Sequence, residues 1–325
     1  MQAVRIHQTG GPEVLTLESN VPLPQPGAGE VQFKVEATGV NFIETYQRTG
    51  LYKVPLPFIP GSEAAGVVSA VGEGVTSLSV GDRIATASGK GGYAQYATAP
   101  AGKCSLVPAS LSTHTAAAAM LQGMTAHYLS HSTFELKPGH VALVHAAAGG
   151  TGQLLVQMAK LLGATVIGTV SSQAKAQVAK EAGADHVILY TVTPDFDEEV
   201  KKIVPGGVHV VYDSVGKTTY EKSIKSLRPR GHLVTFGQSS GAIPPFDLLA
   251  LSAGSFTITR PIMNHYVADE AEFQWRSKDV LGWIAEGKLK VTVSKEFPLE
   301  KAGEAHEAIQ SRDNAGKILL IPPPL

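Results

Sequence analysis

The chain has 325 residues, of which 43% are hydrophobic and 17% are charged. This length exceeds the usual size of a single domain, so we expect two globular domains. The 27 basic residues nearly balance the 28 acidic ones, which argues against a broad basic surface for nucleic acid or anionic lipid. A local basic patch is not excluded by this balance.

The single cysteine, Cys104, excludes an intrachain disulfide framework and a thiolate cluster for a structural metal. It favours a reducing, cytoplasmic environment. The first ten residues, MQAVRIHQTG, lack the apolar core of a signal peptide, and no run approaches the length of a membrane span. We therefore expect a soluble protein that has no membrane partner.

The first third of the chain is rich in Gly and Pro and predicts antiparallel strands. Between residues 31 and 37, apolar side chains alternate with Gln32, Lys34 and Glu36. This period of two predicts a strand with one buried and one solvated face.

After about Met120, apolar β-branched runs alternate with segments of helical composition. Runs of this kind predict strands that are buried on both faces. The predicted strands are residues 141–145, 165–169, 186–190, 208–213 and 232–236, and helices are expected over 153–162 and 174–182. This alternation predicts a doubly wound α/β fold with a parallel sheet. The tail predicts a helix around 280–284 and strands near 291–293 and 318–321.

The segment VALVHAAAGGTGQLLVQMAK, residues 141–160, joins a predicted strand to a predicted helix through small residues. Ala146, Gly149 and Gly152 match the Gly-x-Gly-x-x-Gly spacing loosely, in the strand, turn and helix context that a dinucleotide site requires. Small residues let the backbone approach a pyrophosphate, and the amides at a helix start favour its negative charge. We therefore predict a phosphate cradle, with a merely structural turn as the alternative. The cradle comprises Gly149, Gly150, Thr151 and Gly152.

The end of the next predicted strand indicates which dinucleotide is bound. An NAD site has an acidic residue about 20 residues beyond the glycines to accept from the ribose 2′-hydroxyl, but the stretch GTVSSQAK contains none. Ser171 and Ser172 offer hydroxyls and Lys175 offers a cation, which suits a 2′-phosphate. We therefore predict NADPH as the cofactor. The alternative is that Lys175 is one more solvated lysine on a helix face.

Several motifs together are more specific than the glycine turn. They are NFIETYQRTGLY, PGSEAAGVV, GDRI, VVYDSVG and GKILLIP. With these motifs the chain resembles, from about residue 1 to 322, the zinc-independent quinone oxidoreductases of the medium-chain dehydrogenase/reductase superfamily, relatives of zeta-crystallin. The resemblance implies a GroES-like catalytic domain of residues 1–122 and 263–325, with a Rossmann NADPH-binding domain, 123–262, inserted. It also implies reduction of a quinone by NADPH in the cleft between the domains.

In the zinc alcohol dehydrogenases of the same superfamily, the positions of Asn41 and Ser62 carry ligands of the catalytic zinc. The resemblance therefore implies an enzyme without metal. His127 and His131 have the i, i+4 spacing of a metal pair, but they lack a third ligand and a catalytic Glu, so we interpret them as packing residues. A quinone needs a Lewis acid less than a simple carbonyl does, because hydride addition gives a delocalised, aromatic product.

The resemblance also implies individual site residues. Asn41, Tyr46 and Tyr52 are expected to be neutral donors beside the nicotinamide, and Asn41 and Tyr46 also to contact the cofactor. Tyr52 could equally pack at the domain junction with its hydroxyl exposed. Glu63 is interpreted as holding a loop through hydrogen bonds rather than as a catalytic acid. Further expected cofactor contacts are Thr125, Ser171, Tyr190, Ser214, Phe236, Gly237, Ser239, Arg260 and Arg312.

Two other functions remain open on the sequence. One is the NADPH-dependent reduction of activated alkenes such as enones, which makes the same electrostatic demand. The other is a non-enzymatic role as an NADPH-binding, crystallin-like or RNA-binding protein, although the near-neutral charge argues against RNA. We also expect a homodimer, because the segment Ser255–Thr259 reads as the last strand of the nucleotide sheet and its edge needs cover.

Overall fold

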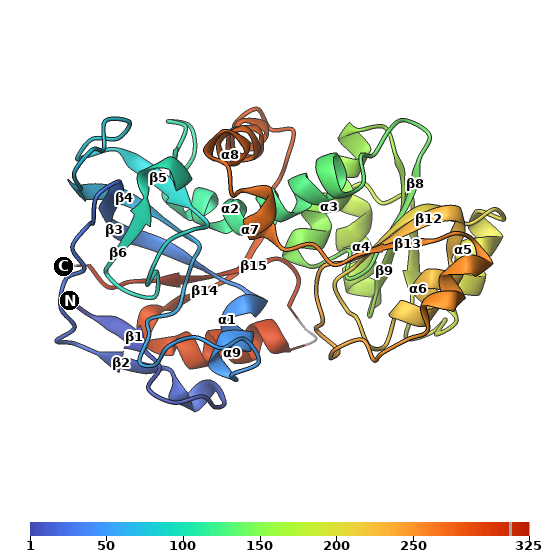
Figure 1. Ribbon diagram of the computed structural model, residues 1–325, viewed down its shortest axis with the longest axis horizontal. Coiled ribbons are helices and arrows are strands. Elements are labelled where there is room, and N and C mark those ends of the chain that lie inside the picture. Colours follow the sequence, from blue (N-terminus) through green and yellow to red (C-terminus); the bar gives the residue numbers. More distant parts are fainter. Residues whose placement is uncertain (312–313, 325) are drawn as a thin grey trace. The chain divides into compact units, whose positions relative to one another are not determined.

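The computed structural model describes residues 1–311 and 314–324. Its internal contacts divide the chain into two compact units (Figure 1). The first unit consists of Met1–Met124 and Val267–Leu325, and the second is Thr125–Tyr266. The C-terminal segment therefore returns to the unit in which the chain began.

The first unit is built on a mostly antiparallel sheet of seven strands within the described residues, in the order β14-β15-β3-β4-β5-β7, with β6 paired to β3. Its strands are β3 (Glu30–Val40), β4 (Ala64–Val71), β5 (Arg83–Thr86), β6 (Tyr96–Pro100), β7 (Ser105–Leu106), β14 (Val293–Pro298) and β15 (Lys317–Ile321). A separate ribbon pairs β1 (Ala3–Arg5) with β2 (Thr16–Glu18). The pairing of β15 with β3 makes the C-terminal segment an integral part of this sheet.

The helices of this unit are α1 (Phe42–Arg48), α2 (Thr113–Tyr128, which continues into the second unit), α8 (Glu270–Ala285) and α9 (Ala302–Gln310). Short 3₁₀ turns lie at Pro12–Val14, Ala101–Lys103 and Leu299–Lys301. The predicted helix at 280–284 lies within α8, whereas the predicted strand at 291–293 begins only at Val293.

Strand β3 differs from its predicted pattern on one face. The apolar set that includes Val31 and Phe33 is buried, as the alternation predicts, but Gln32 on the opposite face is also only 8% exposed. Its Nε2 donates to the Pro24 carbonyl at 2.6 Å, and its Oε1 accepts from the Ser69 hydroxyl at 2.6 Å. The expectation of a solvated face was wrong at this position, because neighbouring segments cover it and satisfy the buried amide.

The second unit contains a parallel sheet of six strands within the described residues, in the order β10-β9-β8-β11-β12-β13. Its strands are β8 (Val141–Val144), β9 (Thr165–Val170), β10 (His186–Leu189), β11 (Val208–Asp213), β12 (Leu227–Thr235) and β13 (Thr257–Thr259). Its helices are α3 (Gly150–Leu161), α4 (Gln173–Glu181), α5 (Phe196–Ile203), α6 (Tyr220–Lys225) and α7 (Met263–Tyr266), with a π-helical turn at Leu129–Thr133 and a 3₁₀ helix at Leu248–Ala253. This is the doubly wound α/β fold that the sequence predicts.

The β-branched runs of the second unit form a core on both faces of the sheet. Leu143 and Ile167 pack with Phe196 and Val200 of α5. On the opposite face, a Cβ at Gly168 would lie 3.9 Å from Ala179 of α4. Helices therefore cover both faces (Figure 1), which is why these strands read as nearly continuous apolar runs.

Strand β12 begins five residues earlier than the sequence predicts. Its first part, LRPRG, contains Pro229 and Gly231, which both disfavour strands. The pairing with β11 shifts register between Val208 and Val210, and Arg230 has a φ of 62°. A bulge of this kind accommodates residues that a regular strand would exclude.

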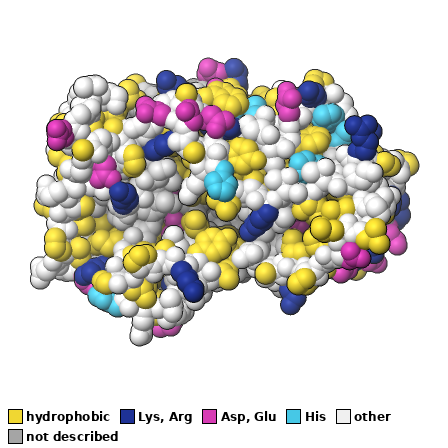
Figure 2. Space-filling view, viewed as in Figure 1, with side chains coloured by type: hydrophobic (Ala, Val, Ile, Leu, Met, Phe, Trp, Pro, Cys, Tyr) yellow, Lys and Arg dark blue, Asp and Glu magenta, His cyan; other side chains and the backbone are white. Residues whose placement is uncertain are grey.

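No helix in the described part of the chain is long and apolar enough to cross a membrane. Figure 2 shows Lys and Arg side chains interspersed with Asp and Glu on the face in view, without one continuous basic area.

Candidate functional site

The glycine turn of the second unit links β8 to α3 by a very close backbone approach. Ala146 has a φ of 50°, and its carbonyl accepts from the Gly149 amide at 2.8 Å. A Cβ at Gly152 would lie only 2.2 Å from that same carbonyl oxygen. Gly149 caps α3 with no side-chain hydrogen bond. The first amides of α3 are therefore available to an anion.

Most of the predicted cofactor residues follow the carboxyl ends of the parallel strands. Ser171 follows β9, Tyr190 follows β10, Ser214 follows β11, Phe236 follows β12 and Arg260 follows β13. In a parallel sheet the carboxyl ends of all strands lie on the same side of the sheet, which is where ligands bind in open α/β sheets. The structure thus places these residues with the glycine turn at the carboxyl ends of the strands.

Hydrogen bonds tie the loops at this edge to one another. The Phe236 amide donates to the Asp213 carbonyl at 2.9 Å, and the Ser239 amide donates to the Ser214 carbonyl at 3.2 Å. Arg260 donates from one guanidinium nitrogen to the carbonyls of Thr235 at 2.9 Å and Gly237 at 3.4 Å. The loops after β11, β12 and β13 therefore form one connected surface.

The residues proposed to read the 2′-phosphate lie after β9 and at the start of α4. Ser172 is the N-cap of α4, and its hydroxyl accepts from the Lys175 amide at 3.3 Å. The Ser171 carbonyl accepts from the Thr191 hydroxyl at 3.0 Å. Lys175 is half-buried and the Tyr190 ring is exposed. Hydroxyls, a cation and a helix start are thus combined at a strand end that carries no carboxylate.

A buried polar network behind the glycine turn was missed by the sequence analysis. The Nδ1 atom of His145 lies 2.8 Å from the Thr169 hydroxyl oxygen, and its Nε2 atom lies 2.9 Å from the Ser223 hydroxyl oxygen. Ser223 donates to Asp213 at 3.1 Å, and Asp213 also accepts from the backbone amides after β11. Burial lowers the pKa of His145, against the opposing charge of Asp213. The signal in the sequence was a polar residue at the end of each of three apolar strands.

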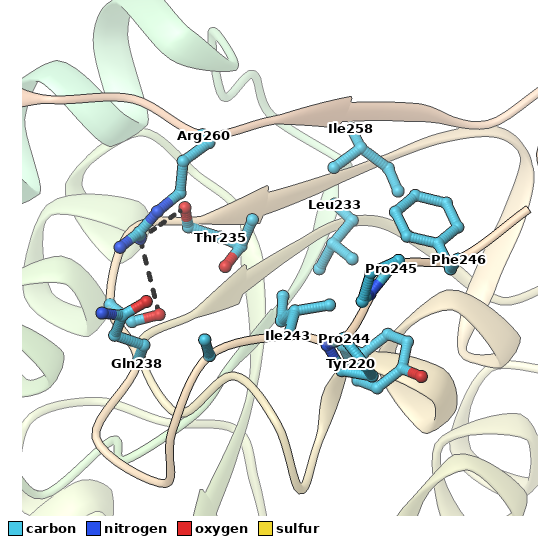
Figure 3. Close-up of a pocket in the computed structure, with 12 residues that line it drawn as sticks. Tyr220, Leu233, Thr235, Gln238, Ile243, Pro244, Pro245, Phe246, Ile258 and Arg260 are labelled. Atoms are coloured by element: carbon cyan, nitrogen blue, oxygen red, sulfur yellow. Dashed lines mark hydrogen bonds between the residues drawn. The ribbon is translucent and has the colours of Figure 1, made fainter. Parts of the chain in front are cut away.

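A pocket of about 550 Å³ lies beside β12 and β13 (Figure 3). Arg260, Thr235 and Gln238 lie at its polar end, while Leu233 and Phe246 belong to the apolar end. The remaining lining residues are Tyr220, Gly237, Ala242, Ile243, Pro244, Pro245 and Ile258. Gly237 and Arg260 line this pocket and also belong to the site at the carboxyl ends of the strands.

In the first unit, four polar residues form a buried cluster around the start of α1. Asn41 directly follows β3 and is 4% exposed. Its side-chain oxygen accepts from Lys317 at 2.6 Å and its side-chain nitrogen donates to Glu63 at 2.8 Å. Lys317 also donates to Glu63, and the Asn41 backbone amide donates to Glu44 at 2.8 Å. Glu63 thus makes the hydrogen bonds expected of a residue that holds a loop.

The aromatic residues proposed with Asn41 lie on and after α1. The rings of Tyr46 and Tyr52 are tilted, with centroids 5.3 Å apart, and the Tyr52 amide donates to the Tyr46 carbonyl at 3.0 Å. The surrounding side chains of Phe42, Ile43 and Leu51 are exposed. Together they form an aromatic and apolar surface with two phenol hydroxyls.

Two further expected cofactor residues have different outcomes. Thr125 belongs to the second unit, where its hydroxyl lies 4.0 Å from the Met263 sulfur. Arg312 lies outside the described residues.

The histidine pair considered as a metal site stacks instead. The rings of His127 and His131 have centroids 4.1 Å apart and planes at 9°. Within residues 1–311 and 314–324, no group of three or more His, Cys, Asp or Glu side chains is placed to hold a metal ion.

Comparison with known proteins identifies relatives over the whole length. Residues 27–109 match the alcohol dehydrogenase GroES-like domain, and residues 150–277 match the zinc-binding dehydrogenase family. The chain is 44% identical to quinone oxidoreductase 1 of Escherichia coli over 98% of this chain and 99% of that protein. It is 43% identical to a 2-haloacrylate reductase of a Burkholderia species over 99% of each. The crystal structure of the E. coli quinone oxidoreductase complexed with NADPH superposes with a TM-score of 0.96 at 43% identity, covering 99% of this chain and 100% of that one.

Proposed function

The chain belongs to the quinone oxidoreductases of the medium-chain dehydrogenase/reductase superfamily, and on this premise we propose that it is an enzyme that transfers reducing equivalents from NADPH to a quinone without a metal. The observation that carries the proposal is the site at the carboxyl ends of the strands in the second unit. There the glycine turn after β8 lies on the same side of the sheet as the end of β9, which carries no carboxylate. The similarity of the whole chain to a quinone oxidoreductase whose structure was solved with NADPH supports the assignment of NADPH as the cofactor.

The residues present fit the cofactor. The close packing of α3 on the turn requires a glycine at position 152, where a Cβ would lie 2.2 Å from the Ala146 carbonyl oxygen, and the uncapped amides of α3 supply donors for a pyrophosphate. When bound, the cofactor supplies a hydride. The residues proposed to hold it are Asn41, Tyr46, Thr125, Gly149, Gly150, Thr151, Gly152, Ser171, Lys175, Tyr190, Ser214, Phe236, Gly237, Ser239, Arg260 and Arg312.

Asn41, Tyr46 and Tyr52 are the proposed donors to the substrate. A quinone is planar, apolar and carries carbonyl acceptors, so it suits the aromatic surface around Tyr46 and Tyr52. As the ring is reduced, negative charge develops on its oxygens, and positioned neutral donors stabilise that charge.

Freedom from metal is supported by the buried cation in the first unit. The Lys317 ammonium contacts both Asn41 and Glu63, so a second cation at these groups would be repelled. Treatment with a chelator should leave the activity intact, and metal analysis should find no stoichiometric zinc. Activity that is lost on chelation and restored by zinc would contradict this part of the proposal.

Steady-state oxidation of NADPH, followed with a panel of quinones and a panel of enones and haloacrylates, tests the function. We expect turnover with quinones. Preferential turnover of activated alkenes would support the second candidate, which the relative named 2-haloacrylate reductase favours. NADPH binding without turnover of any acceptor would support a non-enzymatic role and overturn the proposal.

Lys175→Ala tests the choice of cofactor. Loss of a charge-assisted contact to the 2′-phosphate should cost about 1.5 to 3 kcal/mol, or roughly 10- to 150-fold in NADPH affinity. NADH affinity should barely change, and the loss should appear in KM for NADPH rather than in kcat. Equal losses for NADPH and NADH, or no loss for either, would show that Lys175 does not read the phosphate.

We also propose a homodimer formed through the edge strand near Ser255–Thr259. Strand β13 ends the order of the second sheet, and Leu248 and Leu249, in the 3₁₀ helix that precedes it in the chain, are 73% and 72% exposed. A strand at the end of a sheet and exposed leucines both favour cover by a partner. Light scattering at micromolar concentration should give a dimer, and Leu248→Asp should weaken it. A monomeric wild-type protein would contradict the proposal.

The proposed domains are a catalytic domain of residues 1–122 and 263–325 and an NADPH-binding domain of residues 123–262, which the division of contacts near Met124 and Tyr266 supports. We place the protein in the cytoplasm, because its one cysteine, Cys104, is buried and forms no disulfide.

A further inference from the structure

We propose that the buried pair of Lys317 and Glu63 is a positioning device that fixes the side-chain amide of Asn41 in one orientation for the reaction. This inference rests on the proposed function, in which Asn41 is a donor. The structure places the three residues together by the register of three neighbouring strands. Lys317 begins β15 next to the pair Ile318 and Val40, Asn41 follows β3, and Glu63 precedes β4.

The contacts form a closed ring of hydrogen bonds. Lys317 donates to the side-chain oxygen of Asn41 at 2.6 Å and also to Glu63 Oε2, and the side-chain nitrogen of Asn41 donates to the same carboxylate oxygen at 2.8 Å. The other oxygen of Glu63 accepts from the Leu121 amide at 2.7 Å. The side chains of Lys317 and Glu63 are only 1% and 0% exposed, so water does not replace any member.

This ring distinguishes the oxygen of the Asn41 side-chain amide from its nitrogen. A flip of Asn41 would place its nitrogen donors against the ammonium of Lys317 and its oxygen against the carboxylate of Glu63. Both contacts would be repulsive, and both would occur where water cannot screen them. The amide orientation, which is a free choice at an exposed asparagine, is therefore determined here by a buried charge on each side.

One donor of the amide remains weakly used. The nitrogen of Asn41 has two hydrogens; one is donated to Glu63, and the other contact that this nitrogen makes within the described residues is with the Gly39 carbonyl at a long 3.5 Å. Since the amide oxygen is bound to an ammonium, the nitrogen is polarised towards stronger donation. The ring therefore presents one oriented and activated N–H, which suits an oxygen on which charge develops.

Two observations indicate that the local fold is built around the pair. A Cβ at Gly39 would lie 2.1 Å from Glu63 Oε2 and 2.8 Å from Lys317 Cε, so any larger residue would displace the pair. The backbone of Asn41 is fixed separately, because its N–H donates a hydrogen bond to the Glu44 carboxylate at 2.8 Å. Buried ion pairs add little net stability compared with apolar residues of similar size, so stability alone does not account for this arrangement.

A double-mutant cycle tests the inference. The pair is neutralised as a unit in Glu63→Gln/Lys317→Met, so neither charge is left unpaired, and Asn41→Ala removes the amide. If the pair acts through Asn41, each variant should lower kcat with a quinone by roughly 10-fold, and their combination should lower it no further. Independent roles would give a roughly 100-fold loss in the combined variant and would overturn the proposal, as would an unchanged kcat in Glu63→Gln/Lys317→Met.

Thr38→Val is the matched control. The Thr38 hydroxyl donates to the backbone carbonyl of Glu63 at 2.8 Å, so its removal loosens the same buried region without altering the charges. It should reduce thermal stability and leave kcat unchanged. A loss of kcat in this control equal to that of Glu63→Gln/Lys317→Met would show a merely structural role and overturn the inference.

A second measurement keeps the inference testable if Glu63→Gln/Lys317→Met does not fold. In ¹⁵N-labelled wild-type protein, the side-chain amide of Asn41, identified by its loss in Asn41→Ala, should exchange slowly with solvent and have one strongly shifted proton. A rapidly exchanging, unshifted amide would refute the positioning. If the wild-type enzyme reduces no acceptor, the proposed function fails, whereas this spectrum still decides whether the amide is held.

Discussion

Glu44 makes the stability of the first unit depend on pH in an unusual direction. This carboxyl is buried on α1, one of its oxygens has no hydrogen-bond partner, and the other accepts from the Asn41 amide at 2.8 Å. Burial, with the neighbouring charge of Glu63 and against the opposing charge of Lys317, raises the pKa of Glu44 from 4.5 to about 7. The shift corresponds to about 3 kcal/mol at about 1.36 kcal/mol per pKa unit.

The sign of the effect follows from proton binding. Between pH 4.5 and about 7 the folded state holds a proton on Glu44 that the unfolded state has released. Stability is therefore fully present below pH 4.5, falls as the pH rises through this window, and levels off above about pH 7. Glu44→Gln is neutral at every pH, so the variant should gain up to about 3 kcal/mol relative to wild type between pH 4.5 and 8.

Urea unfolding followed by tryptophan fluorescence measures this difference in the relevant unit. Both tryptophans, Trp275 and Trp283, lie in the first unit, so the signal reports the unfolding of that unit. Any fixed cost of the new amide is the same at each pH and cancels in the comparison. Glu300→Gln, which makes the same substitution at an exposed site of this unit, is the control and should follow wild type. Parallel pH profiles for wild type and Glu44→Gln would refute the reasoning.

Three further predictions concern buried groups. Gly152→Ala places a Cβ 2.2 Å from a turn carbonyl, so NADPH affinity should fall roughly tenfold or more in a fluorescence titration, whereas Gly282→Ala, which meets nothing within 4 Å, should retain it. Burial lowers the pKa of His306 from 6.5 to about 3, so stability should fall as the pH drops through this window, and His306→Gln should flatten that loss in acid unfolding curves. Asp213→Asn should destabilise the second unit by about 2 to 4 kcal/mol in thermal unfolding followed by circular dichroism, because the carboxylate accepts from two backbone amides and two hydroxyls.

The fold of the second unit was predictable because its signals are local. Most of its strands contain an apolar β-branched run, and consecutive small residues mark the turn after β8. The early start of β12 was not predictable, since Pro229 and Gly231 disfavour a strand and only the bulge accommodates them.

The polar cluster of the first unit could be predicted only in part. The resemblance implies a role for Asn41, and Glu63 could be interpreted as a hydrogen-bonding residue from its setting. Lys317, however, is 254 residues from Glu63 in sequence. No local pattern distinguishes such a lysine from a solvated one, because its role depends on a strand pairing that brings the two ends of the chain together.

The pairing of β15 with β3 determines which of the two units can finish folding first during synthesis. The second unit is contiguous, so all of its strands have left the ribosome before β15 is translated. The first sheet, by contrast, lacks an internal strand until the last segment arrives. Until then Glu63 has no ammonium partner, and its carboxylate favours an open, hydrated arrangement of the early strands. Cotranslational folding should therefore finish the inserted unit first and close the surrounding one last.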